Sequence, residues 1–328
     1  MTYKIVCFCG GGIRGLLSAK ILENLAAYCP KILTNTDLFA GTSTGSGIIS
    51  WLLAGKKPTW IVNEGFLNQE FNFFSNPSTP PSADSPAYSI DDVVTGQWEL
   101  HQDKMLSDFE QQSVLFTAFN VGSVTEPPQG PIYTPWSPVL FSNLPNSPNR
   151  DTMIKIAVAS SSAMPGMLGS CNGNIDGAFV NHDPTLAAIA MAIDNYPELS
   201  LSDIVVICIG TGLMTNWIAS DTHDWGAHQW QNGDGNSNNN TPALLVRGSV
   251  SPILNAVMNG TSVSLVPELA GMMLQGNYAN LNPPVRFYIP ENDVRPGDLK
   301  YLQEQAADCD PQQMSNAKSL LDTYWAQS

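Results

Sequence analysis

The chain has 328 residues, of which 43% are hydrophobic, and a formal net charge of −15. This size and apolar content suit a globular protein with a large core, and the negative charge argues against attraction to nucleic acid or strongly anionic surfaces. Because the chain has no Lys or Arg between Lys155 and Arg247, any contact with a lipid surface must rely mainly on apolar side chains.

Two strand–loop–helix units open the chain. Residues 3–9 form an apolar, strand-like run that stops at Gly10-Gly11-Gly12-Ile13-Arg14-Gly15, and apolar residues then recur at helical spacing. Residues 37–54 repeat the plan, with the turn Gly41-Thr42-Ser43-Thr44-Gly45 between strand and helix. Two such units predict an α/β protein with a largely parallel sheet.

The middle of the chain is less regular. Two stretches rich in Pro, Ser or Asn, 72–89 and 126–150, are typical of surface loops, and the second contains seven prolines. We therefore expect residues 72–150 to be a loop-rich region, either a connector or a cover over a site. Residues 105–109 and 153–160 have helical patterns, and residues 113–121 have a strand-like pattern.

The second half predicts further elements of the same fold. Residues 203–209 are almost continuously apolar, which is typical of a central strand buried on both faces, and they end at Gly210-Thr211-Gly212. We expect a single domain over 1–328 with a helical tail at 290–328. The other expected elements are a turn at 174–178, helices at 184–194, 244–274 (with a weak break at 259–260) and 316–325, and a strand at 285–289.

Nothing in the sequence indicates a membrane span or a secretory leader. No segment approaches the roughly 20 consecutive apolar residues of a spanning helix, and the chain begins with a strand-like run. The cysteines lack the C-x-x-C spacing of a metal site; they are Cys7, Cys9, Cys29, Cys171, Cys208 and Cys309. We expect a cytoplasmic protein, and export without a cleaved leader is the alternative.

The first glycine cluster permits two interpretations. Gly10, Gly12 and Gly15 match the G-x-G-x-x-G pattern of dinucleotide-binding loops, but the expected acidic partner is missing, because Asp37 stands at the start of the second strand. Successive backbone N–H groups at a helix start can equally bind an oxyanion. Gly11 and Gly12 then supply N–H groups that can approach a tetrahedral intermediate closely.

Ser43 is the candidate nucleophile. A serine between two glycines at a strand-to-helix turn is the G-x-S-x-G arrangement that exposes a reactive hydroxyl. The same residues could instead form a tight turn with a helix-capping serine. The chain has few candidates for the base: His101, His223 and His228 lie in polar stretches, His182 is close to a helix start, and Asp176 lies on a sharp Asp-Gly turn.

These features together resemble the patatin-like phospholipase family. The family's glycine loop corresponds to residues 10–15, its nucleophile turn to residues 41–45, and its Asp-Gly-Gly/Ala element to Asp176-Gly177-Ala178. The order is also the same, and residues 160–165 and 207–212 resemble the segments that flank the aspartate in that family. The resemblance covers roughly residues 3–289.

The resemblance implies a three-layer α/β/α fold and calcium-independent hydrolysis of lipid acyl esters by a serine–aspartate dyad, with no cofactor. It assigns the nucleophile to Ser43 and the general base to Asp176. The expected substrates are phospholipids, lysophospholipids or neutral acyl esters, met at a lipid surface. The oxyanion donors would be the N–H groups of Gly11, Gly12 and Ile13, and the supporting residues are Gly10, Arg14, Gly15, Gly41, Gly45 and Gly177.

Two departures from the family pattern and two alternative functions stay open. Cys9 stands where many members of the family have an aspartate before the glycines. After the aspartate turn, Asn181-His182-Asp183-Pro184 replaces the family's frequent Asn-Asn-Pro, and His182 could assist catalysis. Residues 234–245 resemble the start of a calcium loop but lack its Gly and Glu, so we expect no metal. An acyltransferase using Ser43 and a lipid-binding or storage protein are the alternative functions.

Overall fold

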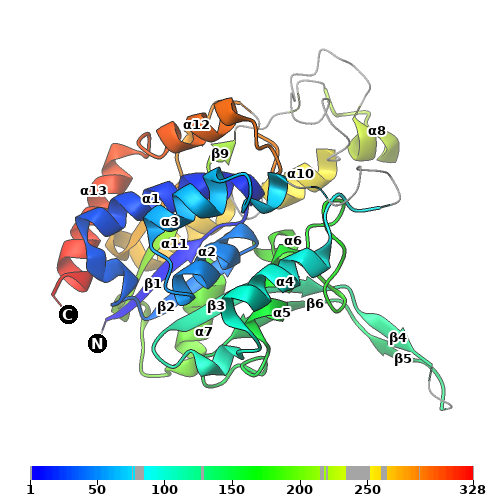
Figure 1. Ribbon diagram of the computed structural model, residues 1–328, viewed down its shortest axis with the longest axis horizontal. Coiled ribbons are helices and arrows are strands. Elements are labelled where there is room, and N and C mark those ends of the chain that lie inside the picture. The colour runs from blue at the N-terminus through cyan, green and yellow to red at the C-terminus, as the bar shows by residue number, and fades with distance from the viewer. Residues whose placement is uncertain are drawn as a thin grey trace.

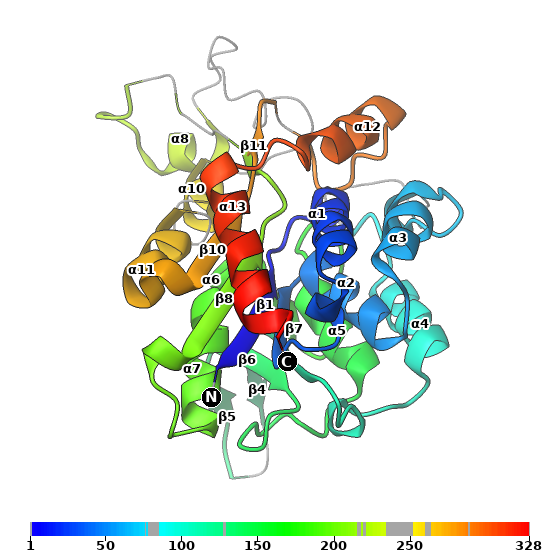
Figure 2. The same ribbon diagram turned by 90° about the vertical axis from the view of Figure 1, so that its left-hand side faces the viewer.

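A seven-stranded sheet organises the fold and lies between two layers of helices (Figures 1 and 2). The computed structural model describes residues 2–75, 77, 85–126, 129–214, 218, 221–233, 252–259, 264–287 and 289–327. The strands are β10 (Tyr278–Leu281), β8 (Ile204–Ile209), β1 (Tyr3–Phe8), β2 (Leu38–Thr42), β3 (Ser113–Asn120) and β6 (Ser137–Ser142) in spatial order, with β7 (Asn174–Asp176) also paired to β3. The first five run parallel, and β6 and β7 are antiparallel to β3.

Helices cover both faces of the sheet. The core on one face is built from α1 (Gly15–Tyr28), α2 (Thr44–Leu53), α5 (Ile154–Ser162), α12 (Pro296–Gln305) and α13 (Pro311–Leu320). The core on the other face is built from α7 (Thr185–Asn195) and α11 (Val266–Leu274). The predicted three-layer α/β/α fold with a mainly parallel sheet is therefore confirmed.

The central position of β8 is also confirmed. Val205, Ile207 and Ile209 belong to the first core, whereas Ile204, Val206 and Cys208 belong to the second. Every residue of the strand is fully buried. A strand that contributes side chains to two cores has to be apolar throughout, which explains the pattern in the sequence.

One loop prediction and one strand prediction were wrong. The proline-rich stretch 126–150 contains β6. This strand lies at the edge of the sheet and, among the described strands, pairs only with β3, so that the proline within it, Pro138, is tolerated. The last strand of the sheet is β10, whereas the predicted strand 285–289 contributes only to the two-residue strand β11 (Pro284–Val285), paired with β9 (Leu213–Met214). The sequence of β10, Tyr-Ala-Asn-Leu, has too little apolar character to indicate a strand.

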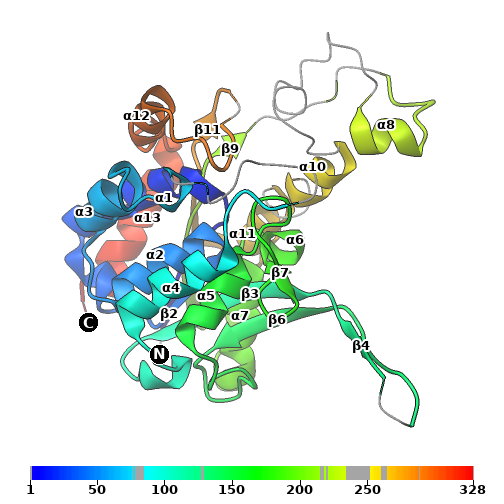
Figure 3. The ribbon, with the colours of Figure 1, turned by 45° about the vertical axis from the view of Figure 1, so that its right-hand side comes forward.

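The remaining elements are short or peripheral. A hairpin of β4 (Ser123–Thr125) and β5 (Ile132–Thr134) projects away from the body of the molecule (Figure 3). Other helices are α3 (Pro58–Trp60), α4 (Ile90–His101), α6 (Ala178–Asn181), α8 (Ala227–Asn232) and α10 (Pro252–Asn259). Part of the predicted helix 244–274 lies outside the described residues. No helix of the described chain has the length and apolar character needed to cross a bilayer.

The C-terminal end is fixed to the core by Trp325. This side chain is fully buried, and its indole N–H donates to Thr36 Oγ1 at 2.9 Å. Thr36 lies just before β2, so the contact joins the end of the chain to the start of a central strand.

We expect Trp325→Ala to lower the free energy of unfolding by about 3–5 kcal/mol, because it leaves a large cavity and removes a buried hydrogen bond. Trp325→Phe keeps most of the apolar volume and should cost clearly less. Urea unfolding measures both. A loss below about 1 kcal/mol for the alanine variant would show that the C-terminal turn is not part of the cooperative core.

Candidate active site

Ser43 occupies a sharp turn between β2 and α2, at the carboxyl edge of the parallel strands. Its backbone has φ 54° and ψ −121°, a conformation that non-glycine residues rarely adopt. The turn is possible because the chain passes very close to its neighbours: a Cβ on Gly45 would collide with the carbonyl of Phe8, and one on Gly41 with the backbone of Gly45. The sequence around Ser43 is therefore a strained strand-to-helix turn.

Asp176 reaches Ser43 from a distant part of the sequence. It ends β7, and this strand pairs with β3, so that Asp176 stands opposite Ala118. The Ser43 hydroxyl donates to Asp176 Oδ2 at 2.7 Å, and the Ala178 N–H donates to Oδ1 at 2.8 Å. A Cβ on Gly177 would overlap with the Thr117 carbonyl, so this glycine lets the aspartate turn pack directly on β3.

The Asp176 carboxyl is almost completely buried, with 1% of its surface exposed. Burial raises its pKa well above the ordinary range, to about 7, and the nearby Glu291 adds to this effect, while the hydrogen bonds from Ala178 and Ser43 oppose it. A carboxylate with a pKa near neutrality is a far better proton acceptor than an exposed aspartate.

The glycine loop lies against this serine. A Cβ on Gly10 would be 3.4 Å from Ser43 Cβ. The Gly10 N–H donates to the His182 carbonyl at 3.0 Å and the Arg14 N–H to the Gly11 carbonyl at 3.1 Å. Among the described residues, no acceptor binds the N–H groups of Gly11 and Gly12, where φ is 145° and 58°. Backbone N–H groups without a partner in the fold are of the kind that can bind an anion.

The Ile13 N–H, by contrast, has a partner in this conformation. It donates to the Glu291 carbonyl at 2.7 Å, and Glu291 lies so close to Gly12 that a Cβ there would collide with it. Arg14 is buried and holds the same segment, because its Nη1 donates to the Ile289 carbonyl at 2.9 Å and its Nη2 lies 3.6 Å from Glu291 Oε1. The segment 289–291 therefore lies across the glycine loop.

Several contacts around the site were not expected from the sequence. The Ser43 N–H donates to Ser161 Oγ at 2.9 Å, and the Ser46 hydroxyl donates to the Ser43 carbonyl at 2.6 Å. The run of three serines at the end of a buried helix was the only local signal for Ser161. Gly15, predicted as a supporting residue, packs against the Thr44 and Phe66 side chains and lets α1 approach α2.

No histidine forms a hydrogen bond with Ser43 or Asp176 in the described part of the chain. His101 lies in a polar stretch of the sequence, yet it is buried and contacts Ser50 Oγ at 2.9 Å. His182 is buried beside the glycine loop, and burial together with Arg14 lowers its pKa to about 4. His223 and His228 are exposed.

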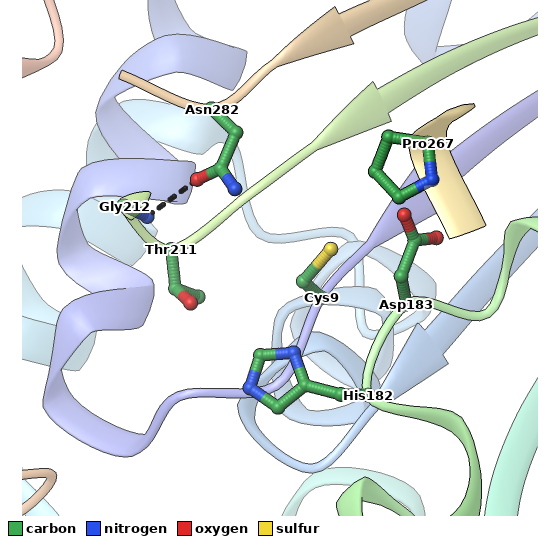
Figure 4. A pocket seen from close by; sticks show the side chains of 7 residues that line it. All are labelled: Cys9, His182, Asp183, Thr211, Gly212, Pro267 and Asn282. Atoms are coloured by element: carbon green, nitrogen blue, oxygen red, sulfur yellow. Dashed lines mark hydrogen bonds between the residues drawn. The ribbon is translucent and has the colours of Figure 1, made fainter. Parts of the chain in front are cut away.

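Two groups of residues bear on metal binding. The stretch 234–245, which resembles the start of a calcium loop, lies outside the described residues. Cys9, Asp183 and Cys208 form a buried cluster of side chains of the types that bind metals, and Figure 4 shows two of them, Cys9 and Asp183. These three residues come from separate elements, which is why no spacing in the sequence reveals them.

The chain is similar to several known proteins. The sequence model of the family described as patatin-like phospholipase matches residues 6–189. Protein teg from Priestia megaterium is 27% identical over 298 residues, which cover 86% of this chain and 88% of that protein. CotR from Bacillus subtilis is 29% identical over 230 residues, which cover 68% of this chain and 67% of that protein. The solved structure of VipD from Legionella pneumophila has a TM-score of 0.43 at 10% identity, covering 99% of this chain and 67% of that one.

The raised pKa of Asp176 predicts how the free energy of unfolding depends on pH. The folded chain holds the Asp176 proton more tightly than the unfolded chain, so the stabilisation from this group is complete below about pH 4 and is lost as the pH rises through about 7. Asp176→Asn is neutral at every pH, and we expect it to raise the free energy of unfolding above pH 7 by on the order of 1–3 kcal/mol.

Urea unfolding from pH 4 to pH 8 measures this difference. Ser43→Ala is the control, because it keeps the buried carboxyl and should retain the loss of stability with rising pH. If Asp176→Asn were less stable than the wild type at pH 8, this would contradict the prediction that the ionised Asp176 carboxylate destabilises the folded protein.

Proposed function

We propose that this chain, which belongs to the patatin-like phospholipase family, is a calcium-independent lipid acyl hydrolase with Ser43 as its nucleophile and Asp176 as its general base. The family supports lipid acyl hydrolysis in general. The observation that carries the specific assignment is the 2.7 Å hydrogen bond from the Ser43 hydroxyl to the buried Asp176 carboxyl.

In the proposed first half-reaction, Ser43 Oγ attacks the acyl carbonyl carbon while Asp176 Oδ2 accepts the hydroxyl proton. The carbonyl oxygen becomes an oxyanion, which receives hydrogen bonds from the N–H groups of Gly11 and Gly12. Asp176 then returns the proton to the leaving alcohol, and the acyl group stays on Ser43 as an ester. Ile13 becomes a third donor only when Glu291 moves away from it.

The second half-reaction repeats these roles with water. Asp176 accepts a proton from a water molecule that attacks the acyl-enzyme, the same N–H groups bind the oxyanion, and the proton returns to Ser43 as the fatty acid leaves. The pKa of Asp176, about 7, supports both steps, because a carboxyl with this value can accept and release a proton near neutral pH.

The charge distribution supports neutral or zwitterionic lipid esters as substrates, including phospholipids and lysophospholipids. Arg14 is the only basic residue of the glycine loop, and it is buried and bound to the segment 289–291. We therefore give Arg14 a bracing role and not a role in binding a phosphate head group.

The hairpin β4–β5 is the surface that we propose to contact lipid aggregates. It extends from β3, the strand that pairs with the aspartate element, and between residues 121 and 136 it has one charged residue, Glu126. Four large side chains are more than half exposed there: Val124, Ile132, Tyr133 and Trp136. Tyr and Trp prefer the boundary between water and lipid, because they combine an apolar ring with a polar group.

The hydrolase proposal predicts that two single substitutions abolish turnover. Ser43→Ala removes the nucleophile, and Asp176→Asn removes the base, so each should lower kcat/KM for p-nitrophenyl acyl esters by about 10³-fold or more with a chelator present. A fluorophosphonate should label the wild type but not Ser43→Ala. The exposed Ser202→Ala is the matched control and should behave as the wild type.

The same assay distinguishes the other functions. A rate close to that of the wild type in either variant would contradict the dyad. Absence of both labelling and turnover in the folded wild type would indicate a lipid-binding or storage protein. Added alcohols or thiols that capture most of the acyl product would indicate an acyltransferase with the same serine.

The hairpin proposal predicts a separate loss. Tyr133→Ser combined with Trp136→Ser should lower binding to phosphatidylcholine vesicles by about tenfold or more, while hydrolysis of a soluble short-chain ester stays unchanged. The control is Phe71→Ser, which removes an aromatic side chain of similar exposure (66%) outside the hairpin. Unchanged vesicle binding, or a change in oligomeric state instead, would contradict a lipid-binding hairpin.

A further inference from the structure

Three ligand-type side chains meet behind the glycine loop. Cys9 follows β1, Cys208 lies in β8, and Asp183 lies just before α7, and all three are buried, with 6%, 0% and 1% of their surfaces exposed. Cys9 Sγ is 3.7 Å from Cys208 Sγ, which is 3.5 Å from Asp183 Oδ2, and all three ligand atoms lie within 4.8 Å of one another. Cys9 and Cys208 belong to the core on the side of α7 and α11.

These distances agree with tetrahedral zinc coordination. Zinc–sulfur bonds of about 2.3 Å and zinc–oxygen bonds of about 2.0–2.2 Å at a tetrahedral angle place two sulfurs about 3.8 Å apart and a sulfur and an oxygen about 3.5–3.7 Å apart. The two measured separations, 3.7 Å and 3.5 Å, are close to these values. Thiolates with a carboxylate are donors that zinc accepts readily.

The burial of Asp183 without a cationic partner points in the same direction. Its carboxylate accepts from the Thr185 N–H at 2.9 Å and from the Cys208 thiol, but no Lys, Arg or His of the described chain forms an ion pair with it. A buried carboxylate is unfavourable unless a cation or several donors accompany it. A bound divalent cation would supply the missing positive charge.

A fourth donor is available at the same place. His182 is 5% exposed, and its Nδ1 has no hydrogen-bond partner among the described residues. His182, Cys9 and Asp183 line one small cavity together with Thr211 (Figure 4), and its volume of about 10 Å³ admits a single water-sized body. The unpaired ring nitrogen at this cavity is what a further zinc ligand requires.

We propose that Cys9, Cys208 and Asp183 form a structural zinc site, with His182 Nδ1 as the fourth ligand after a small movement of its ring. Binding of one Zn²⁺ displaces the two thiol protons to solvent, and the carboxylate and the two thiolates become ligands. The ion takes no part in acyl transfer. It joins β1, β8 and the start of α7, and so fixes the glycine loop, because Cys9 precedes Gly10 and the Gly10 N–H binds the His182 carbonyl.

The test is the metal content of the full chain, purified without a histidine tag and equilibrated with Zn²⁺. We expect one tightly held zinc per chain by elemental analysis, and after exchange to Co²⁺ a thiolate-to-cobalt absorption band in the near ultraviolet. Removal of the zinc with a strong chelator should lower Tm, and re-addition should restore it. These readouts do not depend on ester hydrolysis, so they can succeed or fail independently of the proposed function.

Variants identify the ligands. Cys9→Ser, Cys208→Ser and Asp183→Asn should each lose most of the zinc, whereas Cys309→Ser should keep it. Cys309 is the matched control, because it is a free cysteine with the same 6% exposure as Cys9, in the C-terminal region of the chain. If the ligand variants do not fold, competition of the wild type with a chromophoric zinc chelator still gives the affinity.

Three results would overturn the proposal. The first is a folded wild type that binds no zinc and has six reactive thiols after denaturation. The cluster would then consist of two thiols and a neutral carboxyl joined by hydrogen bonds. The second is the loss of two thiols with a mass lower by about 2 Da, which means a disulfide between Cys9 and Cys208. The third is zinc that persists in all three ligand variants.

Discussion

The structure depends on one antiparallel pairing at the end of a parallel sheet. Parallel strands bring their carboxyl ends to one edge, which places the turn at Ser43 and the glycine loop side by side. The carboxyl that faces the serine does not come from one of these parallel strands. The short strand β7 does so by adding to the end of β3 in the opposite direction, so that Asp176 emerges next to Ser43. The hydrogen bond between the two residues therefore joins the end of a parallel strand to the end of an antiparallel one.

Close backbone approach is the second constraint on this arrangement. Gly45 rests on the Phe8 carbonyl, Gly177 on Thr117, and Gly12 on Glu291, with no space for a side chain at any of them. Such contacts keep the three loops at fixed separations without long side chains that could change rotamer. The small residues that identify the motifs in the sequence are therefore also the residues that set the geometry of the site.

Much of the fold and the site could be predicted from the sequence, because the motifs are local. A few neighbouring residues are enough to predict the turn at Ser43 and the buried strand β8. The contacts that were missed join distant segments: Glu291 to Ile13, Ser161 to Ser43, and Cys9 to Cys208 and Asp183. Strands β6 and β10 were missed because their positions at the two edges of the sheet allow a proline or polar residues that a central strand excludes.

The carbonyl of Glu291 gives the glycine loop an internal ligand. It accepts the Ile13 N–H at 2.7 Å, as the oxygen of an ester substrate would. In the proposed reaction, a substrate that used this donor would have to displace an oxygen of the same chain that the fold already holds in place. Under the proposed function, this competition would reduce the affinity for small soluble esters, whereas a lipid held at a surface would present its carbonyl at a high local concentration. On this proposal, the resting loop would favour substrates that arrive concentrated in two dimensions over those that arrive singly from solution.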